Sequence, residues 1–142
     1  TMDIAMRRML RLLPALLVLS AAFLLSACQR GEADKALLQA PAVGDLYAAE
    51  LSAFSDYEFT DDKQTAIDPA YGLMKVVAVE DNGVVVVTEN AALGTRDRAR
   101  SDIKDPSTIV FDDSERISIS KADLAKAYED DLIYVVRRPT AE

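Results

Sequence analysis

The chain of 142 residues contains no histidine and only one cysteine, Cys28. The absence of histidine excludes zinc sites of the Cys/His type and any catalytic triad or dyad that uses histidine as its base. A single cysteine excludes an intramolecular disulfide, so the fold must be held together by its apolar core. The five glycines are isolated from one another, which excludes a glycine-rich phosphate-binding loop.

Positive charge is also scarce, since 16 lysines and arginines face 24 aspartates and glutamates, for a net charge of −8. An acidic surface repels the phosphates of nucleic acid and of lipopolysaccharide. We therefore expect no nucleic-acid partner. A basic protein partner agrees with this charge, and so does the simpler interpretation that the charge keeps the protein soluble.

The N-terminal segment has the three parts of an export signal. Three arginines (Arg7, Arg8 and Arg11) precede an uncharged run over residues 12–25. This run of about 14 residues is too short for a comfortable membrane-spanning helix, which needs about 20 residues. The segment closes with Leu25, Ser26, Ala27 and Cys28.

These four residues resemble the lipobox of bacterial lipoprotein precursors. The resemblance implies that a signal peptidase recognises Leu25, Ser26 and Ala27, that a diacylglycerol is attached to the Cys28 sulfur, and that cleavage precedes Cys28. Acyl chains on Cys28 would make the membrane a partner. Gln29 in place of aspartate favours the periplasmic face of the outer membrane of a Gram-negative bacterium. An uncleaved anchor, or a secreted protein with an incidental thiol, remains an alternative, and either Met2 or Met6 could be the start.

The chain is expected to have four parts: a signal peptide at 1–27, a flexible tether at 28–42, a single small globular domain at 43–138 and a tail at 139–142. The tether contains glycine, proline and alternating charge, although residues 34–39 could form a helical turn. The two long polar stretches 55–70 and 90–114 are expected to be loops, either functional or disordered.

The pattern of the domain predicts strands and one short helix. Asn82-Gly83 between two apolar runs is a strong hairpin signal, and the valines at 84–87 favour a strand buried on both faces. Ser120 and Asp123 match a helix N-cap, with Leu124 and Tyr128 on the face that packs on the sheet. The expected elements are strands at 46–54, 71–80, 84–89, 115–119 and 132–137, a brief edge strand at 108–111 and a helix at 121–130.

This order predicts a mainly β fold with one short helix (α+β). All pairings can be antiparallel. The architecture is either a small SH3-like barrel or an open five-stranded sheet.

Two groups of residues are candidates for contact with a partner. Arg96, Arg98 and Arg100 form the dense positive run of the chain. If the segment is extended, the three guanidinium groups lie on one face and could bind a carboxylate or phosphate. If the segment is helical, they point in different directions. The aromatic residues Tyr57 and Phe59 lie in the first long loop and could form a peptide-binding groove, as in SH3-like barrels.

Tyr47 and Tyr71 could belong to such a groove too, but core positions with their hydroxyls at the rim are the preferred interpretation. The Arg run could likewise be a soluble loop balanced by neighbouring aspartates.

Other sequence patterns give little support for a catalytic or metal-binding site. Ser101 and Lys104 match Ser-x-x-Lys of penicillin-recognising enzymes, but the partner motifs are absent. The carboxylate clusters at 61–62, 112–115 and 129–131 lack the spacing of a calcium loop, so no metal or other cofactor is expected. A pair of carboxylates brought together by the fold could hydrolyse a glycan, and sequence alone does not reveal such a pair.

Three functions follow from these observations. The first is a non-enzymatic lipoprotein that binds a protein partner in the envelope, as an inhibitor or immunity-type module. The second is a carboxylate-dependent hydrolase of cell wall or glycan. The third is a structural envelope lipoprotein without a ligand of its own.

Overall fold

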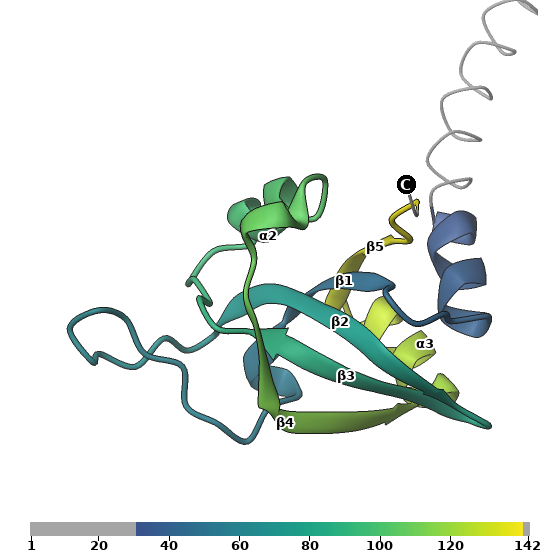
Figure 1. Cartoon of the computed structure of the whole chain (residues 1–142), viewed down its shortest axis with the longest axis horizontal. Helices are drawn as coiled ribbons and strands as arrows, with labels where there is room; N and C mark the ends of the chain where they lie inside the picture. The colour runs from purple at the N-terminus through teal and green to yellow at the C-terminus, as the bar shows by residue number, and fades with distance from the viewer. Residues whose placement is uncertain (1–30, 141–142) are drawn as a thin grey trace, which may run out of the picture. The chain divides into compact units, whose positions relative to one another are not determined.

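The computed structural model describes residues 31–140 (Figure 1). From Asp34 onward these residues belong to one compact unit, to which the following description refers. The expected lipobox, Leu25 to Cys28, lies outside the described residues. Within residues 31–140, no helix is both long and apolar enough to cross a membrane.

Five strands form one antiparallel sheet in the order β4-β3-β2-β1-β5. The strands are β1 (Leu46–Glu50), β2 (Tyr71–Glu80), β3 (Gly83–Glu89), β4 (Phe111–Ser120) and β5 (Ile133–Arg137). The helices are α2 (Asp97–Asp102) and α3 (Lys121–Glu129), with short 3-10 segments η1 (Leu51–Ala53) and η2 (Pro106–Thr108).

The predicted fold class is therefore confirmed, and of the two expected architectures the structure has the open sheet. A closed barrel would require β4 to pair with β5, and the pairings among residues 31–140 leave these two strands at opposite edges. Strand β2 has the predicted bounds, and β3 lies between β2 and β4 with Val84, Val86 and Val87 fully buried.

Alternating residues of β1, which is paired on both sides, build an apolar cluster on each face of the sheet. Tyr47 and Ala49 point into the larger cluster, together with Met74 of β2 and Leu124 of α3. Leu46 and Ala48 belong to the smaller cluster on the other face. There the helix α2 and the turn after it supply Ala99 and Ile103. The two helices thus cover opposite faces of the sheet (Figure 1).

The structure differs from the expected elements at three places in the chain. The first strand ends at Glu50, because the Leu51 N–H donates to the Ala70 carbonyl at 2.7 Å and the chain turns into η1. The connection after β3 contains the helix α2, which the polar pattern of 90–114 did not indicate. Strand β4 begins at Phe111 rather than at residue 115, and its register against β3 shifts between Val86 and Thr88. The prediction of a brief edge strand at 108–111 is wrong, because Thr108 ends the 3-10 segment η2 and Phe111 already belongs to β4.

The N-terminal part of the described chain is more ordered than a tether. Residues 31–39 are helical, and Leu38 is buried in the larger cluster. The Tyr128 hydroxyl of α3 donates to Asp34 at 2.9 Å. The compact unit therefore begins before the expected domain boundary at residue 43. The predicted cap of α3 is confirmed, since Ser120 Oγ accepts a hydrogen bond from the Asp123 N–H at 3.1 Å.

An ion pair joins the start of β1 to the end of β5. Asp45 is fully buried, and its carboxylate accepts from Arg138 at 2.8 Å and 3.0 Å. The same carboxylate accepts from the Ala42 N–H at 2.9 Å, and Arg138 also donates to the Ala40 carbonyl. A buried charge is tolerated only when it is paired and hydrogen-bonded in this way.

Replacement of Asp45 by alanine tests this ion pair. We expect Asp45→Ala to lower the free energy of unfolding by about 2–3 kcal/mol, because buried hydrogen bonds to a charged group are lost. Asp62→Ala removes an exposed carboxylate from the 55–70 loop and is the matched control. Denaturant unfolding of both variants would measure the difference, and equal stabilities would contradict a structural role for Asp45.

Candidate functional site

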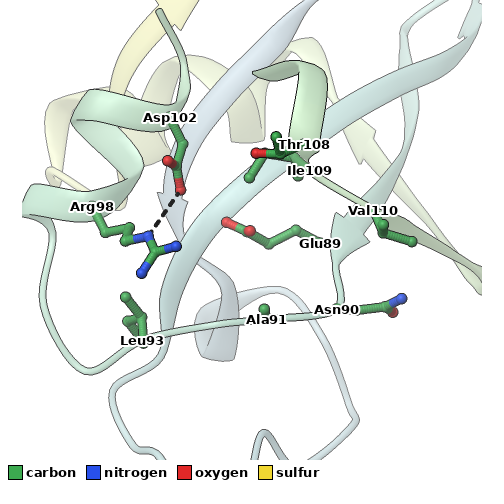
Figure 2. A pocket seen from close by; sticks show the side chains of 9 residues that line it. All are labelled: Glu89, Asn90, Ala91, Leu93, Arg98, Asp102, Thr108, Ile109 and Val110. Atoms are coloured by element: carbon green, nitrogen blue, oxygen red, sulfur yellow. Dashed lines mark ion pairs between the residues drawn. The ribbon is translucent and has the colours of Figure 1, made fainter. Parts of the chain in front are cut away.

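A cavity of about 420 Å³ lies between α2, the end of β3 and the segment that leads into β4. Its wall combines two carboxylates and a guanidinium, from Glu89, Asp102 and Arg98, with apolar side chains of Leu93, Ile109 and Val110. Figure 2 shows the three charged side chains pointing into the same space. We call this cavity the Glu89 pocket.

Glu89 is the last residue of β3, and only 4 % of its surface is exposed. The ladder between β2 and β3 ends at the pair Met74–Thr88, just before Glu89. Beyond that pair, the Glu89 side chain replaces a strand partner for Leu73, since its Oε1 accepts a hydrogen bond from the Leu73 N–H at 2.7 Å. Gly72 makes room for this carboxyl group, because a Cβ at that position would collide with it.

Burial raises the pKa of Glu89 to about 7. Removal of the carboxyl from water disfavours its charged form, and the nearby Asp102 carboxylate adds to this effect. The hydrogen bond from Leu73 and the positive charge of Arg98 act in the opposite direction. Glu89 therefore changes its charge near neutral pH, which is unusual for a glutamate.

The other two charged residues of the pocket face each other on α2. Arg98 Nε lies 3.7 Å from Asp102 Oδ2, one helical turn away. The Arg98 side chain is 69 % exposed and that of Asp102 is 20 % exposed. An ion pair this open to solvent is weak and can rearrange when another charged group enters.

The helix α2 divides the arginine run that sequence analysis singled out. Arg98 lines the Glu89 pocket, whereas Arg96 and Arg100 lie over aromatic rings. The Arg96 guanidinium is 5.3 Å from the ring centres of Tyr71 and Tyr134, which meet edge to face. The Arg100 guanidinium is 5.2 Å from the Tyr134 ring. The segment is thus helical, and its three guanidinium groups do not form one anion-binding face.

The two aromatic candidates of the first long loop differ in exposure. Tyr57 is 54 % exposed, whereas Phe59 is half-buried against the larger cluster. Both line a second hollow that adjoins the Glu89 pocket, because Glu89 and Asn90 line both. Tyr57 therefore lies near the Glu89 pocket.

Tyr47 and Tyr71 were expected at core positions with their hydroxyls at the rim, and Tyr47 does lie in the core. This side chain is fully buried, and its hydroxyl lies inside the core rather than at the rim. The hydroxyl has no hydrogen-bond partner among the described residues. Tyr71 is half-buried and supports Arg96, as described above.

The remaining candidate motifs do not form a site in the part of the chain that the structure describes. Ser101 and Lys104 are both exposed at the end of α2. Across residues 31–140, no group of three or more acidic, histidine or cysteine side chains is arranged to hold a metal ion.

Sequence reasoning missed Glu89, although one signal pointed to it. The residue closes a run of valines that favours a strand buried on both faces, so its carboxyl group was placed where a charge is costly. Asp102 and Arg98 could not be assigned to the same site, because their contact with β3 depends on the unrecognised helix α2.

The pKa of Glu89 predicts a pH-dependent stability. A raised folded-state pKa means that the folded chain holds this proton more tightly than the unfolded chain does, so stability falls as pH rises from about 4.5 to about 7. Glutamine imitates the neutral form. We expect Glu89→Gln to match the wild type at pH 5 and to exceed it by about 2–3 kcal/mol at pH 8.

Urea unfolding at both pH values measures this effect. Glu80→Gln, at an exposed position at the end of β2, should follow the wild type throughout. An equal effect of Glu89→Gln at pH 5 and pH 8 would show that the Glu89 carboxyl titrates normally.

No protein-family model matches this chain, and no curated protein and no solved structure is significantly similar to it. Its function must therefore be argued from its own residues.

Proposed function

We propose that the chain is a lipoprotein, anchored through Cys28 to the periplasmic face of the outer membrane, that binds a protein partner as an inhibitor or immunity-type module. The anchor is supported by the lipobox resemblance at Leu25 to Cys28. Acyl chains on Cys28 would hold the compact unit at the membrane surface, where it can meet other envelope or secreted proteins.

The observation behind the binding function is a surface that combines an apolar rim with buried charge. Val110 and Tyr57 are 65 % and 54 % exposed, and Val110 lines the pocket while Tyr57 lines the adjoining hollow. The Asn90 N–H donates to the Val110 carbonyl at 2.9 Å, which fixes the two segments side by side. Exposed aromatic and apolar side chains around a concave site are typical of protein-binding surfaces.

Both long connections contribute to this surface. The loop 55–70 supplies Tyr57, and the connection between β3 and β4 supplies Val110 and α2. The two connections emerge at the same end of the sheet (Figure 1). The net charge of −8 would attract a basic partner over a distance and raise the rate of encounter.

Capture of a partner by the soluble part of the chain tests this proposal. Residues 29–142 contain every strand and both apolar clusters, so they should fold without the N-terminal segment. We expect mild crosslinking in envelope and secreted fractions to recover one stoichiometric protein. Val110→Ser and Tyr57→Ser should weaken its binding about tenfold, as loss of a central contact does.

Val79→Ser is the matched control, because Val79 is 45 % exposed but lies beside the β2–β3 turn, at the other end of these strands. It should bind as the wild type does. Recovery of no partner, or equal weakening by all three substitutions, would argue against the proposed surface and leave a structural lipoprotein as the alternative.

A second candidate function is hydrolysis, and one specific observation favours it. Glycoside hydrolases use a protonated carboxyl group beside an ionised one, and Glu89 has a raised pKa in a cavity that it shares with Asp102. Such an enzyme would release sugar from peptidoglycan below pH 7 and lose this activity in both Glu89→Gln and Asp102→Asn. A binding module would show no turnover in any form, as measured by release of reducing ends.

A further inference from the structure

The carboxyl group of Glu89 is buried with only part of its bonding capacity used. Oε1 accepts from the Leu73 N–H, and Glu89 makes no other hydrogen bond or ion pair within residues 31–140. The side chain points into the pocket (Figure 2). A buried carboxylate that is not ion-paired is costly, so this group is suited to a cation that enters from outside.

The pocket itself offers one cation for two carboxyl groups. Arg98 pairs with Asp102 rather than with Glu89, and its largely exposed side chain can move aside. The apolar wall of Leu93, Ile109 and Val110 suits a long aliphatic chain. Lysine and arginine have this character, with an apolar stem and a charged end.

We propose that the Glu89 pocket receives a lysine or arginine side chain of the protein partner, whose charged end pairs with the Glu89 carboxylate. This inference rests on the proposed binding function and names the group that the partner inserts. The stem would pack on the apolar wall, while Tyr57 and Val110 contact the neighbouring surface of the partner.

Pairing with a cation requires the ionised form of Glu89, so binding is coupled to loss of its proton. With a pKa of about 7, about a tenth of the carboxyl groups are ionised at pH 6 and about nine-tenths at pH 8. Binding of a cation should therefore be about tenfold tighter at pH 8 than at pH 6. The ionisable groups that face or approach Glu89 are Arg98 and Asp102 of α2, Asp112 of β4, Tyr134 of β5 and Glu58 of the first long loop.

A small cationic probe tests the pocket without the partner. The probe is N-acetyl-arginine N-methylamide, and the neutral control is N-acetyl-norleucine N-methylamide. Binding to labelled residues 29–142 is followed by the NMR shift of the Leu73 amide, which reports on Glu89 through their hydrogen bond. We expect a saturable shift with the arginine probe, about tenfold weaker at pH 6 than at pH 8, and none with the norleucine probe.

Glu89→Gln should abolish the response while the remainder of the spectrum stays unchanged, and Asp102→Asn should weaken it. Glu80→Gln, with an exposed carboxyl group elsewhere, should respond as the wild type does. The proposal is overturned by no Leu73 shift at the solubility limit of the probe, by equal binding to Glu89→Gln, or by equal affinity at both pH values. Because the probe is a small molecule, this result is independent of whether a protein partner is captured.

Discussion

The position of β1 in the sheet is the constraint on which the remainder of the structure depends. This strand of five residues pairs with β2 on one side and β5 on the other, so it joins the β2–β3–β4 meander to the C-terminal end of the chain. Its alternating side chains begin the two clusters on opposite faces. Without a disulfide, this burial and the Asp45–Arg138 ion pair at the start of the strand keep the two ends of the unit together.

The Glu89 pocket follows from the way in which the layer on the smaller cluster is built. Ala99 and Ile103 pack α2 against Leu46, Ala48 and Leu73, and this contact directs the neighbouring side of α2 toward the end of β3. Arg98 and Asp102 lie on that side, while Arg96 and Arg100 lie against Tyr134. A short helix thus positions the charged side chains of the site and closes the second face of the sheet at the same time.

Local patterns in the sequence predicted the parts of the fold that depend on neighbouring residues. The hairpin at Asn82-Gly83, the bounds of β2 and the Ser120 cap of α3 each rest on a few adjacent side chains, and each is confirmed. The placement of β4 and β5 at opposite edges of the sheet and the position of helix α2 depend on contacts distant in sequence. Apart from Ala99 and Asp102, the residues of α2 are exposed, so its pattern resembles that of a solvated loop.

The candidate site was predictable only in part for the same reason. Arg98 and Tyr57 were selected because of their residue types, and the structure places them in two adjoining hollows. Glu89 could have been noticed as a carboxylate at the end of a buried valine run. Its partners could not, since Leu73 lies 16 residues away in sequence and Asp102 reaches Glu89 only through the packing of α2.

The free edge of β4 bears on how crowded copies of the chain would behave. An edge strand of ten residues could recruit the same strand of a second molecule and begin aggregation. Here the strand contains Asp112, Asp113 and Glu115, and its register is interrupted where these residues lie. Two such edges brought together would place like charges opposite one another along an irregular backbone. These features of β4 disfavour edge-to-edge pairing of two copies at high concentration.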